Sequence, residues 1–277
     1  MEKLTNWLKL WEELSEIQSK SFSRKKVHQD DDFWKDKAKH FQEMVKRRWS
    51  KPDSSRDFIV EALKENPDST LLDIGAGTGA WSLYLAPYAK GITALEPSEA
   101  MAGILKDQLE ETGTGNISIV KENWPGIDIK KHDYILASHS MYGEADFTAF
   151  INKMNETARK TCFLVIRVLF KDAVMAKASE KIMGQPFDSP NFQVAYNALL
   201  DMGIYPSVLM EKGESWEPWT NDSMDDALED IKNRLDLTDT AAHDDYLLTL
   251  LKSELTEKDG KVVWPSGNSS ALVYWDV

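Results

Sequence analysis

The sequence predicts an α/β fold built on a mainly parallel sheet with helices on both faces. Apolar runs rich in branched residues, typical of buried parallel strands, alternate along the chain with segments of helical periodicity. The first such run, residues 71–74, ends in a glycine-dense turn that leads directly into a helix beginning at Ala80. This order of strand, loop and helix forms the nucleotide-binding opening of doubly wound α/β folds.

The alternation continues to the end of the chain and gives seven strands. We expect them at residues 71–74, 91–96, 116–120, 133–139, 161–170, 203–210 and 271–275. Helices are expected at residues 56–65, 80–86, 101–112, 146–158 and 191–202. Strands separated by helices predict a parallel sheet.

Two segments lie outside this alternation. Residues 1–52 have a helical pattern rich in aromatic residues, and we expect an N-terminal helical cap there, before an α/β domain at 53–277. Between the sixth and last strands, about residues 214–268, two amphipathic helices at 225–235 and 244–255 predict a helical insertion. Its core is too thin to stand alone, so we expect a small lid.

The amino-acid composition restricts the kinds of substrate, metal and compartment that we expect for this chain. The net charge of −13 argues against a nucleic-acid substrate, because nucleic-acid binders usually present a basic face. A single cysteine and five histidines without zinc spacing predict no metal site. We also expect no membrane span and a cytoplasmic protein, since no apolar run is long enough and the N-terminus lacks signal-peptide features.

The glycine turn has the pattern D-x-G-x-G-x-G, beginning at Asp73. A dinucleotide-binding turn has G-x-G-x-x-G instead, and an acid so close to it would repel a diphosphate. The same acid suits a ligand that carries an ammonium and a sulfonium. The pattern resembles motif I of the class I S-adenosylmethionine-dependent methyltransferases. The resemblance implies a Rossmann-like sheet with an antiparallel last strand, and cofactor contacts at Asp73, Gly75, Ala76, Gly77 and Gly79.

A second stretch supports the same family. Glu96 ends the second strand about twenty residues after the first glycine, where a carboxylate would take the two ribose hydroxyls. The run from Glu96 through Pro97 to Met101 resembles the family signature acid-x-S-x-x-M, which implies that Met101 lies near the adenine. The alternative is a glycine turn and a strand-end acid that bind nothing.

The end of the third strand resembles the family's adenine site. Relatives often carry an aspartate that accepts a hydrogen bond from the adenine amino group, and this chain has Asn123 at the matching place. Trp124 would then offer a flat apolar wall for the ring, with Glu122 as a rival to Asn123.

The end of the fourth strand, where the transferred methyl group is expected, carries the catalytic candidates. His139 has the intrinsic pKa of a base near neutrality, Tyr142 could orient an acceptor, and Glu144 could tune the histidine. Ser138 is assigned to the cofactor. Alternatively, His139 is hydrogen-bonded to the backbone at the strand end and only positions the loop or the cofactor. Arg167, a charge inside the fifth strand, should pair with an internal acid such as Asp133 or contact an anionic acceptor.

The N-terminal cap carries two further expectations. The acids Asp30–Asp32 should cap a helix that begins at Phe33. The aromatic residues Phe33, Trp34 and Phe41 resemble the stretch that packs on the methionine end of the cofactor in relatives, with plain core packing as the alternative. Tryptophans of the cap and insertion suggest an apolar acceptor pocket: Trp34, Trp49, Trp216, Trp219 and Trp264.

The sequence therefore predicts an S-adenosylmethionine-dependent methyltransferase that acts on a small molecule at an oxygen, nitrogen or carbon atom. A non-catalytic S-adenosylmethionine-binding sensor or partner subunit is the first alternative, because binding residues do not prove turnover. A nicotinamide-dependent oxidoreductase is the second, and the glycine spacing disfavours it.

Overall fold

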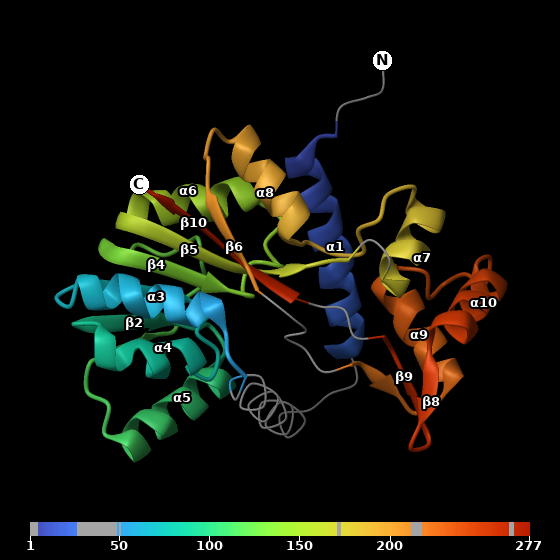
Figure 1. Cartoon of the computed structure of the whole chain (residues 1–277), viewed down its shortest axis with the longest axis horizontal. Coiled ribbons are helices and arrows are strands. Elements are labelled where there is room, and N and C mark those ends of the chain that lie inside the picture. Colours follow the sequence, from blue (N-terminus) through green and yellow to red (C-terminus); the bar gives the residue numbers. More distant parts are fainter. Residues whose placement is uncertain (1–4, 27–48, 50, 171–172, 212–217, 266–268) are drawn as a thin grey trace.

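A seven-stranded sheet forms the centre of the molecule (Figure 1). The computed structural model describes residues 5–26, 49, 51–170, 173–211, 218–265 and 269–277. The strand order is β3-β2-β1-β4-β5-β10-β6, and β10 runs antiparallel to β5 and β6 while the other pairs are parallel. The strands are β1 (Thr70–Ile74), β2 (Gly91–Leu95), β3 (Ile117–Val120), β4 (His132–Ser138), β5 (Ala158–Val168), β6 (Ser207–Met210) and β10 (Ser269–Asp276). The predicted fold class is confirmed.

Helices cover both faces of this sheet. They are α1 (Trp7–Lys26), α3 (Ser54–Glu65), α4 (Ala80–Leu85) with the short 3-10 helix η1 (Ala86–Tyr88), α5 (Glu99–Thr112), α6 (Phe147–Thr157) and α8 (Phe192–Asp201). Several begin at a side-chain cap that the sequence supplies. Asp53 accepts hydrogen bonds from two backbone amides at the start of α3, Asp146 does so once for α6, and Asn191 caps α8.

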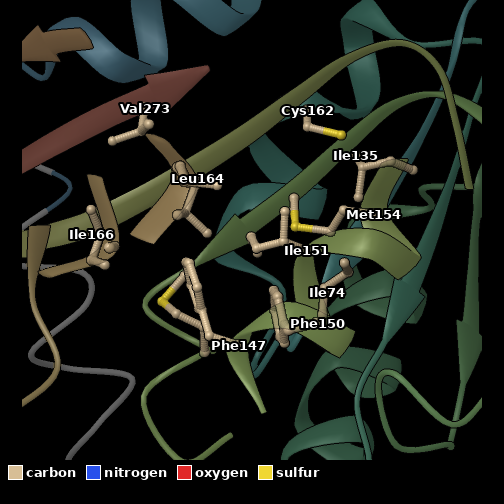
Figure 2. Packing of buried hydrophobic residues seen from close by; sticks show 14 of the residues in the cluster. Ile74, Ile135, Phe147, Phe150, Ile151, Met154, Cys162, Leu164, Ile166 and Val273 are labelled. Atoms are coloured by element: carbon tan, nitrogen blue, oxygen red, sulfur yellow. The ribbon is translucent and has the colours of Figure 1, made fainter. Parts of the chain in front are cut away.

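The core lies on the two faces of β4 and β5, because their side chains alternate between the faces. Cys162, Leu164 and Ile166 point toward α6, α8 and the first half of α1, where they join a fully buried cluster (Figure 2). Phe163 and Val165 point to the opposite face and pack with α3 and the α4–η1 segment. Burial raises the pKa of the Cys162 thiol, as expected for a cysteine that serves as a small core side chain.

The region between β6 and β10 forms a second, smaller cluster beside the sheet. It contains α9 (Met224–Arg234) and α10 (Asp244–Glu254), as the sequence predicts, and also three short strands: β7 (Thr220–Asn221), β8 (Thr256–Lys258) and β9 (Lys261–Val263). A further helix, α7 (Val174–Met183), packs with them although it lies before β6 in the chain. We call α7, α9, α10 and β7–β9 the insertion unit. In Figure 1, α1 runs between this unit and the sheet.

Some expectations lie outside the described residues, namely the cap at Asp30–Asp32, the aromatic contacts of Phe33, Trp34 and Phe41, and Trp216. Of the other tryptophans of the cap and insertion, Trp264 is buried in the core of the insertion unit, as ordinary packing predicts, and Trp219 is about half exposed. None of the described helices combines the length and apolar character that crossing a membrane requires.

Candidate active site

The glycine loop after β1 depends on backbone conformations that side chains disfavour. Gly75, Gly77 and Gly79 all have positive φ, at 69°, 58° and 87°. A Cβ atom on Gly75 would lie 2.4 Å from the Cβ of Ser140, so two strand ends approach closely here. A Cβ atom on Gly79 would lie 2.2 Å from Leu105 of α5. Gly75 is therefore required for reasons of space as well as conformation, whereas at Gly79 the main constraint is the positive φ, because the atoms in the way belong to the Leu105 side chain.

Glu96 connects this loop to the end of β2. One carboxylate oxygen accepts a hydrogen bond from the Gly77 amide at 2.8 Å, and the other accepts one from the Ser98 amide at 2.8 Å. The residue is 7% exposed, so both oxygens are held in place. A carboxylate has about four acceptor positions in all. Glu96 can therefore accept further hydrogen bonds from a pair of ligand hydroxyls without releasing the loop.

Asp73 is buried beneath the loop. Its carboxylate accepts a short hydrogen bond of 2.6 Å from the Ser82 hydroxyl. Burial raises the pKa of Asp73 to about 6, and the nearby charge of Glu96 adds to this, while the bond from Ser82 opposes it. Two carboxylates near one glycine loop suit a ligand that carries positive charge and hydroxyl groups.

The remaining predicted cofactor residues lie around the same loop. Ala76 donates its amide to the Leu95 carbonyl, Pro97 is exposed, and Met101 lies half-buried in the first turn of α5. Asn123 is exposed after β3. Trp124 is half-buried against Phe150, and its indole donates to the Phe150 carbonyl at 3.3 Å.

The end of β4 carries a chain of polar contacts. The Tyr142 hydroxyl lies 2.7 Å from Nδ1 of His139 and accepts the amide of Arg167 at 2.8 Å. Nε2 of His139 lies 3.3 Å from the hydroxyl of Ser270 on β10. His139 has a φ of 55°, a strained conformation for a side chain of this size. The two predicted catalytic residues are thus in direct contact with each other.

Two sequence-based interpretations of this region are wrong. Glu144 does not tune His139, because its carboxylate accepts the Asp146 amide at 3.0 Å in the turn before α6. Asp133 does not pair with Arg167, because it accepts two hydrogen bonds from Thr70 at the opposite end of the sheet. Both errors have the same cause, since a sequence shows which charges exist but not which turn or strand end will use them.

Trp81 and Ser140 were not predicted as site residues, whereas Trp49 was expected in the acceptor pocket and Ser138 at the cofactor. The indole of Trp81 donates to the Ser138 hydroxyl at 2.8 Å, and its ring meets Trp49 edge to face. A small cavity beside them is lined by Trp49, Trp81, Asp53 and Arg56. Ser140 has a buried hydroxyl without a hydrogen-bond partner in the described part of the chain. The position of Trp81 directly after the glycine loop was a signal for that residue, but nothing in the sequence indicated Ser140.

This arrangement can now be compared with known proteins. A family model described as a methyltransferase domain matches residues 41–194, more than half of the chain. The chain belongs to this family. The predicted class, a class I S-adenosylmethionine-dependent methyltransferase, is therefore confirmed at the level of the family. Across the described residues, no group of three or more His, Cys, Asp or Glu side chains is placed to hold a metal ion.

Curated relatives match this chain over only part of their length. A protein of Methanosphaera stadtmanae named probable ribosomal RNA small subunit methyltransferase A is 30% identical over 125 residues, 45% of either chain. An uncharacterized protein of Haemophilus influenzae is 25% identical over 174 residues, 62% of this chain and 64% of that one. The chain thus spans less than two thirds of the length of either relative.

Solved structures share the whole fold. The plantazolicin methyltransferase BpumL, solved in complex with SAH, is 14% identical, with a TM-score of 0.56 over 97% of this chain and 99% of that one. The YcgJ protein from Bacillus subtilis is 13% identical, with a TM-score of 0.51 over 80% of this chain and 96% of that one. At these identities the likeness concerns the fold.

Proposed function

We propose that the chain transfers a methyl group from S-adenosylmethionine to a small-molecule acceptor. The contact between Glu96 and the Gly77 amide carries the proposal, because it joins the glycine loop to a carboxylate that can accept the ribose hydroxyls. Asp73, 1% exposed beneath the same loop, supplies negative charge for the positively charged end of the ligand.

The other predicted contacts complete this site as we propose it. The backbone of Gly75, Ala76 and Gly79 forms the loop against which the ligand lies, Pro97 and Met101 lie beside the adenine, and Asn123 accepts its amino group. Trp124 borders the ring, and Ser138 orients the ligand from the end of β4. The exposure of Asn123 and Pro97 leaves both accessible to a ligand.

We assign the acceptor chemistry to Tyr142 and His139. S-adenosylmethionine supplies an electrophilic methyl group on a sulfonium, and the chain must align an acceptor and remove its proton. Because the Tyr142 oxygen accepts the Arg167 amide, its own proton is directed to Nδ1 of His139, 2.7 Å away. An acceptor proton can pass to the tyrosine oxygen while the tyrosine proton moves to Nδ1, which leaves a protonated imidazole.

Coverage of the acceptor side favours a small acceptor. The Trp11 indole on α1 donates to the carbonyl of Glu144 at 2.8 Å, which fixes α1 over the loop that contains Tyr142. The insertion unit is joined to the loop before α8 by an ion pair of 2.7 Å between Arg234 and Asp188. With a net charge of −13, such a covered site suits a small molecule better than RNA.

Calorimetric titration with S-adenosylmethionine, S-adenosylhomocysteine and NADH tests the cofactor. Both adenosyl ligands should bind, and Gly77→Arg and Glu96→Ala should each weaken binding about 100-fold or more, because they fill the loop or remove its carboxylate. Glu99→Ala is the matched control, since Glu99 is an exposed acid three residues away that pairs with Lys121. Binding of NADH alone would contradict the proposal.

Transfer of a labelled methyl group tests the acceptor class. The rRNA methyltransferase named among the relatives makes RNA the competing acceptor. Incorporation of label into small molecules but not into ribosomal RNA is the expected result. Efficient labelling of the RNA, lost in Glu96→Ala, would overturn the small-molecule acceptor and keep the methyltransferase.

A further inference from the structure

Arg167 is a charged residue in a strand that is otherwise buried at this end. It is the next-to-last residue of β5 and follows five buried positions, Cys162–Ile166. Its guanidinium lies over the Tyr142 ring, with Cζ 5.2 Å from the ring centre, and Nη2 donates to the Ser189 hydroxyl at 2.6 Å. Arg167 is thus held beside the catalytic candidates by an aromatic ring and a neutral hydroxyl.

The charges around Arg167 do not balance. Among the residues that the structure describes, no carboxylate oxygen lies within 4 Å of its guanidinium. The nearby Asp188 is paired with Arg234 at 2.7 Å. Burial favours the protonated form of Asp188, but Arg234 and then Arg167 outweigh it and hold its pKa below the usual range. Two guanidiniums therefore face one carboxylate, and one positive charge remains.

The hydrogen bonds of Arg167 are also incomplete. Its Nε atom is buried and has no partner within the described part of the chain. Leaving a buried charged donor unsatisfied is costly, so such groups usually have a ligand or a water molecule as partner. An arginine kept only for structure would be expected to pair with the acid next to it, which here pairs with Arg234 instead.

We propose that Arg167 binds a carboxylate of the methyl acceptor. This inference rests on the proposed function and narrows its substrate class. Arginine presents a planar set of donors that matches an oxyanion, and the contact would hold the acceptor beside the Tyr142 hydroxyl. A single surplus positive charge matches the −1 charge of a carboxylate better than the −1.5 to −2 charge of a phosphate monoester.

The test uses matched probes on the full chain saturated with S-adenosylhomocysteine. Benzoate, benzamide and phenyl phosphate share an aromatic ring and differ in the group that Arg167 would contact, and saturation-transfer NMR titrations give their affinities. We expect benzoate to bind at least 10-fold more tightly than either other probe. Arg167→Gln should reduce the benzoate-to-benzamide ratio to about one, whereas Arg167→Lys, which keeps the charge, should retain a preference for benzoate.

Arg159→Gln is the control, because Arg159 lies on the same strand at its other end and is half exposed. The Arg159→Gln variant should keep the full preference for benzoate over benzamide. Equal binding of benzoate and benzamide by the unmodified chain, tighter binding of phenyl phosphate, or a preference that survives in Arg167→Gln would each overturn the inference alone. Absence of S-adenosylhomocysteine binding to the unmodified chain would overturn the proposed function and this inference with it.

Discussion

The candidate site has a cofactor half and an acceptor half, and the residues in contact are much farther apart in the sequence in the acceptor half than in the cofactor half. On the cofactor side, Asp73 and Ser82 are 9 residues apart in the chain, and Gly77 and Glu96 are 19 apart. On the acceptor side, Trp11 reaches the carbonyl of Glu144 across 133 residues, and the His139–Ser270 contact spans 131. The hydrogen bonds that hold the glycine loop to Glu96 and Asp73 lie within residues 73–96, whereas the acceptor side is assembled from both ends of the chain.

This difference explains how one fold can serve many acceptors. The glycine loop and Glu96 are set by the ends of β1 and β2, and the proposed contacts at Asn123, Trp124 and Ser138 add the ends of β3 and β4. The acceptor half collects side chains from α1, β5, β10 and the insertion unit, and each of these can change independently. We therefore expect substitutions in the two halves to have separable effects on ligand binding and on stability.

The largest effect should come from Gly75→Ala, which breaks the cofactor half. The residue has a φ of 69°, and its new Cβ would lie 2.4 Å from the Cβ of Ser140, so the loop must shift. We expect at least a 100-fold loss of S-adenosylhomocysteine affinity by calorimetry, because the shifted loop loses its hydrogen-bonded contact with Glu96 and with the ligand. Strain and overpacking should also lower the free energy of unfolding by about 2–4 kcal/mol.

Gly113→Ala separates crowding from backbone strain. Gly113 ends α5 with a similar φ of 65°, but a Cβ there would meet no atom within 4 Å. It should cost about 1 kcal/mol in stability and leave affinity unchanged. Equal losses of affinity in the two variants would mean that the approach of Ser140 to Gly75 is unimportant for the loop.

A second substitution, Asp188→Asn, removes an ion pair of the acceptor half. The Asp188 side chain is 1% exposed and that of Arg234 is 31% exposed, so the substitution leaves a half-buried guanidinium without its opposite charge. We expect the free energy of unfolding, measured with urea, to fall by about 2–3 kcal/mol. S-adenosylhomocysteine affinity should stay within twofold of the original.

Asp222→Asn is the control for this substitution. Asp222 pairs with Lys261 on the surface of the insertion unit, where both side chains are more than half exposed. Its removal should have no measurable effect on stability, as is usual for exposed ion pairs. A large loss of cofactor affinity in Asp188→Asn would show that the halves are coupled.

The same difference in sequence separation decided which features could be predicted from the sequence. The seven strands, the glycine loop and Glu96 follow from local periodicity and one motif, and the antiparallel β10 followed from family resemblance. The strands β7–β9 were missed because each has only two or three residues, too few to show alternation. The partner of Arg167 was predicted wrongly because Ser189 meets it only after β5, the loop before α8 and β10 have assembled.

The stability of the cofactor half should also depend on pH, because Asp73 is buried there. The pKa of Asp73 is raised from 3.8 to about 6 in the folded chain, so folding favours its protonated form. The stability that this supplies is present below pH 4 and is lost as the pH rises through 6, by roughly 3 kcal/mol. The amide of Asp73→Asn cannot ionise, so this variant does not lose that stability. Its free energy of unfolding, relative to that of the original chain, should therefore rise by about that amount between pH 4 and pH 8.

Urea unfolding at both pH values measures this change. Ser82→Ala provides the comparison, because the hydrogen bond from Ser82 lowers the pKa of Asp73 and its removal should steepen the loss of stability with pH. The free energies of unfolding of Asp73→Asn and of the original chain could instead differ by the same amount at both pH values. That result would show that Asp73 is already ionised at pH 4, which would contradict the assigned effect of burial.

The smallest effect should come from Trp11→Phe, which tests whether α1 acts on the acceptor half alone. The new ring can keep the contact with Phe147, whose ring centre lies 4.3 Å from that of Trp11, but the hydrogen bond to Glu144 is lost. The Glu144 carbonyl still accepts the Ser15 hydroxyl at 3.3 Å, so the lost hydrogen bond should cost about 1 kcal/mol, and the cavity left by the smaller ring at this buried position adds about 1 kcal/mol. S-adenosylhomocysteine affinity should be unchanged, while methyl transfer slows because the loop with Tyr142 is less well positioned. A parallel loss of cofactor affinity would instead mean that α1 positions both halves of the site. The two halves would then not respond independently to substitution.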